Sequence, residues 1–65
     1  MSLSVTCDLV SGDRLPADAW RVSLELNHEE IMFREWSCGI HGEHTAEAKR
    51  AAYAFADRLR GALEQ

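Results

Sequence analysis

The apolar residues of this chain repeat at helical spacing in one stretch only, which lies near its end. Residues 48–63 carry this stripe, and its Ala-rich beginning would let a helix approach a sheet closely. Phe55 and Leu59 supply the bulk further along. The stripe consists of Ala48, Ala51, Ala52, Phe55, Leu59, Ala62 and Leu63. A single amphipathic helix needs a second layer to cover its apolar side, so the preceding residues are expected to build a sheet.

Two earlier stretches alternate apolar with polar residues, which is the period of a strand with one buried face. The first covers residues 3–9 and the second covers residues 20–27. Glycine and proline between them indicate a loop over residues 11–19. The polar segment 27–30 is short enough to be a hairpin turn into a third strand.

The third apolar run has strand-like composition but mixed parity. Ile31 and Phe33 suit the buried face of the second strand. Continuing the same alternation would bury Glu35 and expose Trp36. A β-bulge near Arg34 would correct this by turning Trp36 inward and Glu35 outward, and we predict a bulge at that place.

Residues 39–44 form a loop that contains two glycines, after which Thr45 is a suitable N-cap for the helix. Glu47 then lies in the first helical turn, where a negative charge is favourable to the helix dipole. We therefore predict one domain, residues 1–65, of the α+β class. It contains a three-stranded antiparallel sheet with the C-terminal helix packed on one face, in the order β-β-β-α. The other face is left to solvent or to a partner.

Charge is divided unevenly along the chain. Residues 1–43 hold eight carboxylates against three arginines, a balance of −5, and residues 44–65 hold four bases against three acids, a balance of +1, which together give −4. An acidic face on a small domain repels nucleic acid and membranes and attracts basic protein surfaces. We therefore expect a basic protein partner, and no direct binding to nucleic acid or membrane. The alternative is that the acids only keep a small domain in solution.

Size and composition argue against several functional classes. Sixty-five residues leave little apolar material for a deep substrate pocket, so we expect no enzyme, no catalytic residue and no cofactor. No apolar run approaches the roughly 20 residues that span a bilayer, and the first residues lack the pattern of a signal peptide. We expect a cytoplasmic monomer in which Cys7 and Cys38 are reduced thiols.

The segment around the third strand's end holds a possible metal-binding pattern. Cys38, His41 and His44 follow one another at intervals of three residues and are ligand types that zinc accepts. Cys7 or Glu43 would have to complete the set. Because the paired cysteines typical of structural zinc sites are missing, we expect no metal here, only a strand-ending cysteine and two loop histidines.

Two short patterns resemble known families. Residues 48–52 resemble the C-terminal helix of double-stranded-RNA-binding domains, which also follows a three-stranded sheet. That family has two residues between its lysine and its paired alanines, whereas here a single residue separates Lys49 from the alanine pair. The family's first helix is also missing. Residues 42–48 fit the Gly-x-x-Thr-x-x-Ala pattern of HicB-type antitoxins. The first resemblance implies RNA binding, and the second implies a partner toxin that the protein masks.

The whole chain, a small acidic domain with one helix and no catalytic motif, resembles the anti-CRISPR proteins encoded by phages. Its overall sequence is similar to the small inhibitors of type I-C systems. The resemblance implies an inhibitor in the host cytoplasm, whose carboxylates imitate phosphates and occupy the DNA-binding surface of a CRISPR surveillance complex. It assigns no role to individual residues.

The charge pattern by itself predicts which residues would bind such a partner. On the open sheet face these are Asp8, Glu25 and Glu35. Arg21 and Arg34 are expected on the same face, where they could instead form internal ion pairs. The adjoining loops contribute Asp13, Asp18, Glu29 and Glu30.

Overall fold

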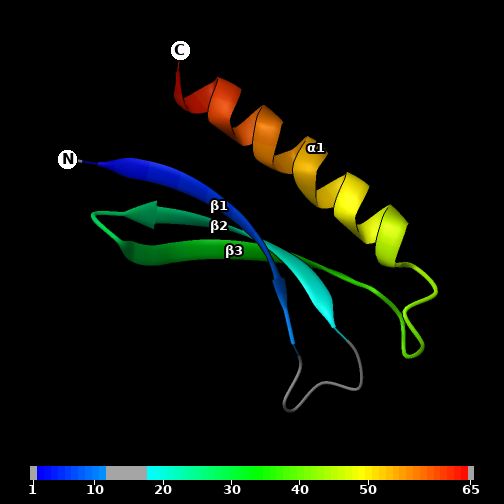
Figure 1. The fold of residues 1–65 in the computed structure, drawn as a ribbon. Helices are drawn as coiled ribbons and strands as arrows, with labels where there is room; N and C mark the ends of the chain where they lie inside the picture. Colours follow the sequence, from blue (N-terminus) through cyan, green and yellow to red (C-terminus); the bar gives the residue numbers. More distant parts are fainter. Residues whose placement is uncertain (1, 12–17, 65) are drawn as a thin grey trace.

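A computed structural model of the chain, which describes residues 2–11 and 18–64, contains one sheet and one long helix (Figure 1). The sheet is antiparallel with the strand order β1-β2-β3, so the middle strand in sequence is also the middle strand in space. The elements are β1 (Leu3–Val10), β2 (Ala19–Leu26), β3 (Glu29–Ser37) and α1 (Thr45–Leu63). The predicted α+β class and the β-β-β-α order are confirmed.

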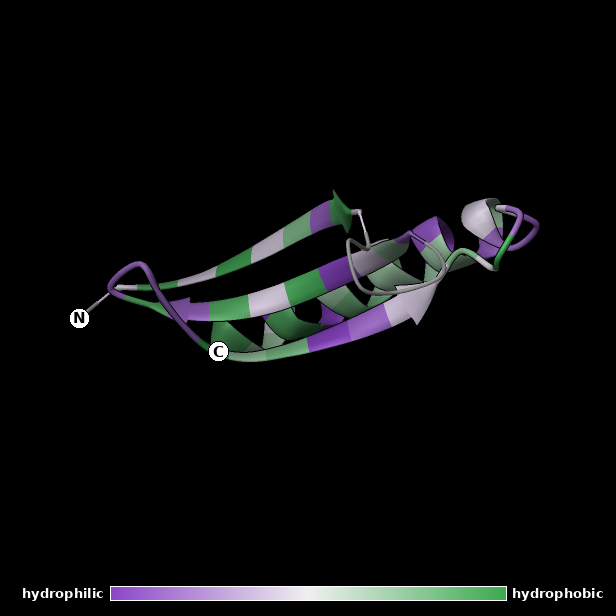
Figure 2. Ribbon diagram, turned by 90° about the horizontal axis from the view of Figure 1, so that it is seen from below, coloured by the Kyte–Doolittle hydropathy of each residue, from purple (hydrophilic) through white to green (hydrophobic). Residues whose placement is uncertain are grey.

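The two faces of the sheet differ because side chains alternate along each strand. The inner face, which contacts α1, is formed by cross-strand rows of mostly apolar residues. These rows are Leu9–Trp20–Trp36, Cys7–Val22–Arg34 and Val5–Leu24–Met32. The alternation is visible as bands of hydrophobic and hydrophilic colour along the strands in Figure 2, where the helix lies behind the sheet.

The helix packs through small side chains, as its Ala-rich sequence predicts. Ala48, Ala52 and Ala56 are buried, and their four-residue spacing places them on one side of the helix. Phe55 fills the space beside them, with its ring centre 5.4 Å from that of Trp36. Ala56 was not among the expected stripe positions.

Two expected stripe residues, Ala62 and Leu63, are instead exposed. The last turn of α1 lies beside the start of β1, where Arg60, Leu63 and Glu64 line a hollow together with Leu3, Ser4 and Val5. It therefore covers the edge of the sheet and does not join the buried cluster around Val22.

The hairpin between β2 and β3 is tighter than expected. Asn27 and His28 have φ angles of 52° and 72°, as in a two-residue type I′ turn. Glu29 and Glu30 therefore belong to β3 and pair with β2, which corrects their placement in the turn. A two-residue turn suits the twist of the strands, and Asn adopts the left-handed conformation readily.

A β-bulge is present in β3, but not near Arg34 as predicted. The register shifts between Leu24, which pairs with Met32, and Glu25, which pairs with Glu30, so Ile31 is the extra residue. Because this register shift comes before Phe33 and not after it, Phe33 and Arg34 each lie on the face opposite to the predicted one. Phe33 lies on the open face, and Arg34 lies on the inner face. Trp36 points inward and Glu35 outward, as expected.

The loop between β3 and α1 is held by its own hydrogen bonds. The His44 backbone N–H donates to the Cys38 carbonyl at 2.8 Å. His44, not Thr45, is the N-cap, and its side chain makes no capping bond. Thr45 is the first helical residue, and its hydroxyl donates back to the Gly42 carbonyl at 2.8 Å.

Candidate functional site

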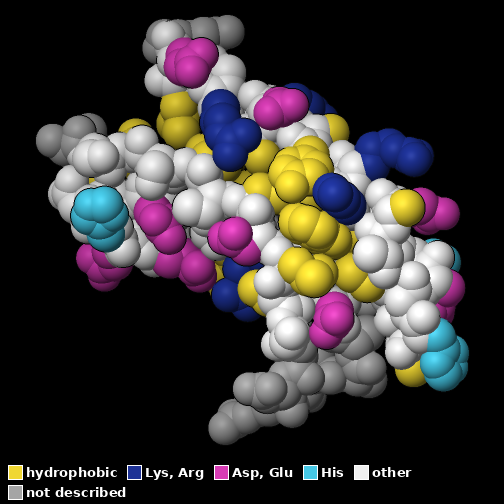
Figure 3. All heavy atoms as spheres, in the orientation of Figure 1, with side chains coloured by type: hydrophobic (Ala, Val, Ile, Leu, Met, Phe, Trp, Pro, Cys, Tyr) yellow, Lys and Arg dark blue, Asp and Glu magenta, His cyan; other side chains and the backbone are white. Residues whose placement is uncertain are grey.

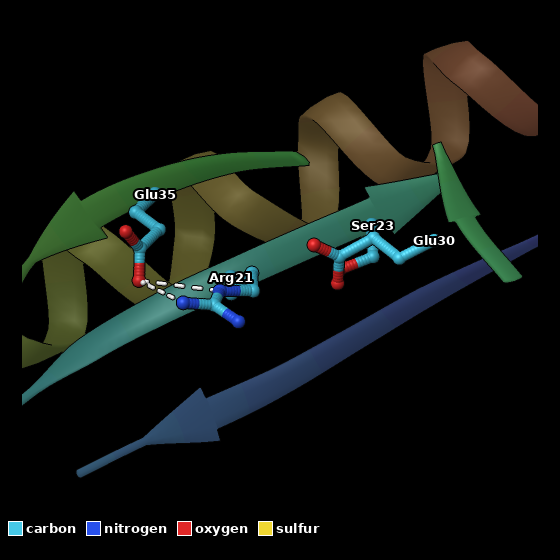
Figure 4. A network of polar contacts seen from close by, with 4 residues as sticks. All are labelled: Arg21, Ser23, Glu30 and Glu35. Atoms are coloured by element: carbon cyan, nitrogen blue, oxygen red, sulfur yellow. Dashed lines mark hydrogen bonds and ion pairs between the residues drawn. The ribbon is translucent and has the colours of Figure 1, made fainter. Parts of the chain in front are cut away.

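The open face of the sheet, opposite to α1, brings together most of the carboxylates that the sequence singled out. Its charged and hydroxyl-bearing residues lie mainly in three cross-strand rows. They are Asp8–Arg21–Glu35, Thr6–Ser23–Phe33 and Ser4–Glu25–Glu30. Figure 4 views this face with the helix behind the strands and shows Arg21, Ser23, Glu30 and Glu35 on the near side. Four carboxylates against one guanidinium leave this face with three negative charges.

The single base on this face is paired with one of the acids. The Arg21 Nε and Nη2 atoms donate to Glu35 Oε2 at 3.2 and 3.1 Å. The Arg21 guanidinium also lies 4.5 Å from the centre of the Phe33 ring. Both partners of the ion pair are partly exposed, so solvent screening limits its contribution to roughly 0–1 kcal/mol. The pair leaves Asp8, Glu25 and Glu30 as the uncompensated acids of the face.

Glu25 and Glu30 lie directly opposite each other in the ladder between β2 and β3. Directly opposed side chains have Cβ atoms about 4.5–5.5 Å apart, and two like charges at this spacing repel. The hydroxyl of Ser23, itself buried, donates to Glu30 Oε2 at 3.1 Å and orients that carboxylate. The arrangement concentrates negative charge beside the β2–β3 hairpin.

The remaining predicted binding residues are dispersed. Glu29 pairs with Leu26 and so belongs to the inner face. Asp18 is exposed just before β2, and its carbonyl accepts a hydrogen bond from the Cys38 N–H at 2.9 Å. Asp13 lies outside the described residues. The expectation that Arg34 lies on the open face is wrong, because the earlier bulge turns it to the inner face.

Sequence reasoning missed two residues of the open face. Ser23 was recognisable from the polar positions of the second strand, because it alternates with Val22 and Leu24. Phe33 could not be placed without knowing where the bulge falls, since Ile31, Met32 and Phe33 are all apolar.

The charges of α1 differ from those of the sheet. Lys49, Arg50, Arg58 and Arg60 outnumber Glu47, Asp57 and Glu64. Figure 3 shows basic side chains along the helix and acidic side chains over the strand ends near the hairpin. Lys49 Nζ lies 5.7 and 5.8 Å from the ring centres of Trp20 and Tyr53, so this lysine is partly engaged within the fold.

The Cys38, His41 and His44 set is not assembled into a coordination sphere. Cys38 is 2% exposed, whereas both histidines are exposed, and His44 Nδ1 lies 3.7 Å from Glu47 Oε2. Within residues 2–11 and 18–64, no group of three or more His, Cys, Asp or Glu side chains could hold a metal ion. The nearby surface hollow of about 440 Å³ is open and lined mainly by loop residues.

The pKa values of Glu43 and Cys7 are shifted from their ordinary values. The Glu43 carboxylate accepts hydrogen bonds from its own backbone N–H and from that of His41, the latter at 2.8 Å, and these bonds lower its pKa. Burial, followed by the nearby charge of Asp8, raises the pKa of Cys7. A thiol with a raised pKa is a poor nucleophile at neutral pH, so neither shift creates a reactive group.

The described helix does not have the length and hydropathy that crossing a membrane requires. Comparison of the chain with models of protein families, with curated proteins and with solved structures found no match.

Proposed function

We propose that the protein is a non-catalytic inhibitor that binds the basic, nucleic-acid-binding surface of a partner protein through its open sheet face. The observation that supports this most is the opposed pair Glu25 and Glu30, which shares with Asp8 a face that no described element covers. The two acids repel each other in the free protein. A partner's arginine placed between them would relieve that repulsion, so binding is favoured over the free state.

A sheet also presents its carboxylates in a fixed geometry. Side chains two residues apart on one strand are separated by about 7 Å, and little rotation of the backbone is left to lose on binding. Regularly spaced negative charge on a rigid surface is the property that phosphates offer to a basic groove. The resemblance to type I-C anti-CRISPR proteins selects the first target to test, the DNA-binding surface of a CRISPR surveillance complex in the host cytoplasm.

The test uses a purified type I-C surveillance complex and double-stranded DNA carrying its target sequence. The protein is expected to compete with DNA, and its association should slow steeply as salt rises, because steering by exposed charges is screened. Replacing both Glu25 and Glu30 with glutamine should slow association by roughly tenfold or more at low salt. The matched control replaces Lys49 and Arg50 with glutamine, which should change association little.

A target other than a surveillance complex would be found by affinity capture from a host lysate with wild-type protein and the Glu25/Glu30 variant in parallel. Partners specific to the wild-type acids should be nucleic-acid-binding proteins or the toxin that the HicB resemblance implies. If the Lys49/Arg50 variant loses activity and the Glu25/Glu30 variant keeps it, the acidic-face proposal fails and RNA binding by the helix takes its place.

A further inference from the structure

A second surface lies away from the open face, where the edge of β3 meets α1. A hollow of about 200 Å³ lies above Val22, which is 1% exposed, and is surrounded by Leu24, Met32, Phe33, Arg34, Phe55 and Leu59. We call this hollow the β3–α1 notch. Its wall is almost wholly apolar, and Arg34 supplies the single charge.

Arg34 is positioned in the notch by aromatic rings and not by a carboxylate. Its guanidinium carbon lies 5.0 Å from the ring centre of Trp36 and 5.3 Å from that of Phe55. Across residues 2–11 and 18–64, no carboxylate lies within 4.0 Å of it. Arg34 lines the notch, and its planar N–H groups can donate to an external carboxylate.

The two edges of the sheet are protected to different degrees. On β1, the Arg60 Nη2 atom donates to the Val5 carbonyl at 3.3 Å, so the helix occupies part of that edge. β3 forms the other edge of the sheet (Figure 2), and no other described strand pairs with its free side. Ile31, Met32 and Phe33 are each more than 50% exposed there. An unpaired apolar edge of this kind favours the addition of an external strand.

We propose that an extended segment of a partner protein adds to the free edge of β3, with its inner-face side chains entering the β3–α1 notch. Met32, Arg34 and Trp36 are successive residues on that face. The incoming segment would therefore need an apolar side chain against Met32, a carboxylate against Arg34 and an apolar side chain against Trp36. The resulting pattern, apolar-x-acid-x-apolar, is the same for parallel and antiparallel pairing.

A second copy of the chain does not suit this position. Two acids in the sequence have an apolar residue both two positions before and two positions after them. They are Asp18, between Pro16 and Trp20, and Asp57, between Phe55 and Leu59. Trp20, Phe55 and Leu59 pack against the core, so they are not free to enter another molecule. The occupant is therefore a different polypeptide. This inference does not rest on the acidic open face.

The test uses a peptide with the sequence Thr-Val-Thr-Asp-Thr-Val-Thr, acetylated and amidated at its ends, titrated into ¹⁵N-labelled protein. Saturable shifts are expected at the backbone amides of residues 31–36, with the amides of Thr6 and Asp8 in β1 unchanged. A matched peptide with asparagine in place of aspartate should bind roughly ten- to a hundredfold more weakly, because a charge-assisted hydrogen bond is lost.

Arg34→Glu should abolish binding of the aspartate peptide and create binding of a peptide with lysine at that position, an exchange that a purely structural role of Arg34 would not produce. Arg34→Gln, which keeps the shape of the side chain, serves if Arg34→Glu does not fold. Glu25→Gln should leave peptide binding unchanged. The proposal is overturned if the aspartate and asparagine peptides bind equally, if the shifts map to β1, or if the β3 amides shift with protein concentration alone, which would make the occupant a second copy.

Discussion

Glu30 lies directly opposite Glu25 across the ladder between β2 and β3, and the hydroxyl of Ser23 donates to it at 3.1 Å. Two acids in this relationship cost the free protein stability, because like charges on opposed strand positions repel. The presence of such a pair next to a tight turn, in spite of its cost to stability, is what an acidic binding face would require. The same pair therefore links a prediction about stability to the proposed function.

Glu25→Gln should stabilise the protein. Removing one of the two opposed charges should raise the free energy of unfolding by about 0.2–1 kcal/mol at low ionic strength. Thermal or urea unfolding in 20 mM and 1 M salt measures this, and the gain should shrink in high salt because screening acts over about 3 Å at 1 M. A gain of the same size at both salt concentrations would mean that repulsion is not the cause.

The close contact between α1 and the sheet can be tested with a pair of alanines. Ala52 is 0% exposed, whereas Ala54 lies on the outer side of the helix. Ala52→Leu should lower the free energy of unfolding by about 1–3 kcal/mol, because the larger side chain has no space to fill. Ala54→Leu adds the same atoms and should change stability by less than about 0.5 kcal/mol. Equal effects in chemical denaturation would show that the helix is rotated from the described orientation.

Two glycines should respond oppositely to alanine. Gly39 has a φ of +87°, and a Cβ there would lie 2.5 Å from Glu43 Cδ. Gly39→Ala should destabilise the protein by about 1 kcal/mol or more, since both the backbone and the Glu43 side chain must shift. Gly61 lies in α1 with open space around it. Gly61→Ala should stabilise by about 0.5–1 kcal/mol, because alanine restricts the unfolded chain and favours the helix. Melting temperatures of the two variants give the comparison.

The loop before α1 should loosen in acid. The pKa of Glu43 is lowered by hydrogen bonds from two backbone N–H groups. Because the pKa of this carboxyl is lower in the folded state than in the unfolded state, the carboxylate stabilises the fold. This stabilisation is complete above the ordinary glutamate pKa and is lost as the pH falls through the lower folded pKa. The His41 amide resonance should therefore titrate below the range of a free glutamate. In Glu43→Gln this titration should disappear. A midpoint at the ordinary value would contradict the hydrogen bond between Glu43 and His41.

The sequence by itself determined the element order and most strand faces. Alternation at period two in residues 3–9 and 20–27 is a local consequence of strand geometry, and no distant contact is needed to read it. The helix was recognisable for the same reason, although its exact buried side shifted to include Ala56.

Only the tertiary structure decided which faces Phe33 and Arg34 of β3 occupy. Ile31, Met32 and Phe33 are all apolar, so each could point to the core without breaking the local pattern. The tight turn at Asn27 and His28 sets the pairing of Glu29 and Glu30 with β2. The bulge at Ile31 then reverses the parity of the rest of the strand. Its position depends on the pairing with β2 and on packing against α1, and sequence spacing does not encode it. That one-residue shift moved Phe33 to the open face and Arg34 to the notch beside the helix.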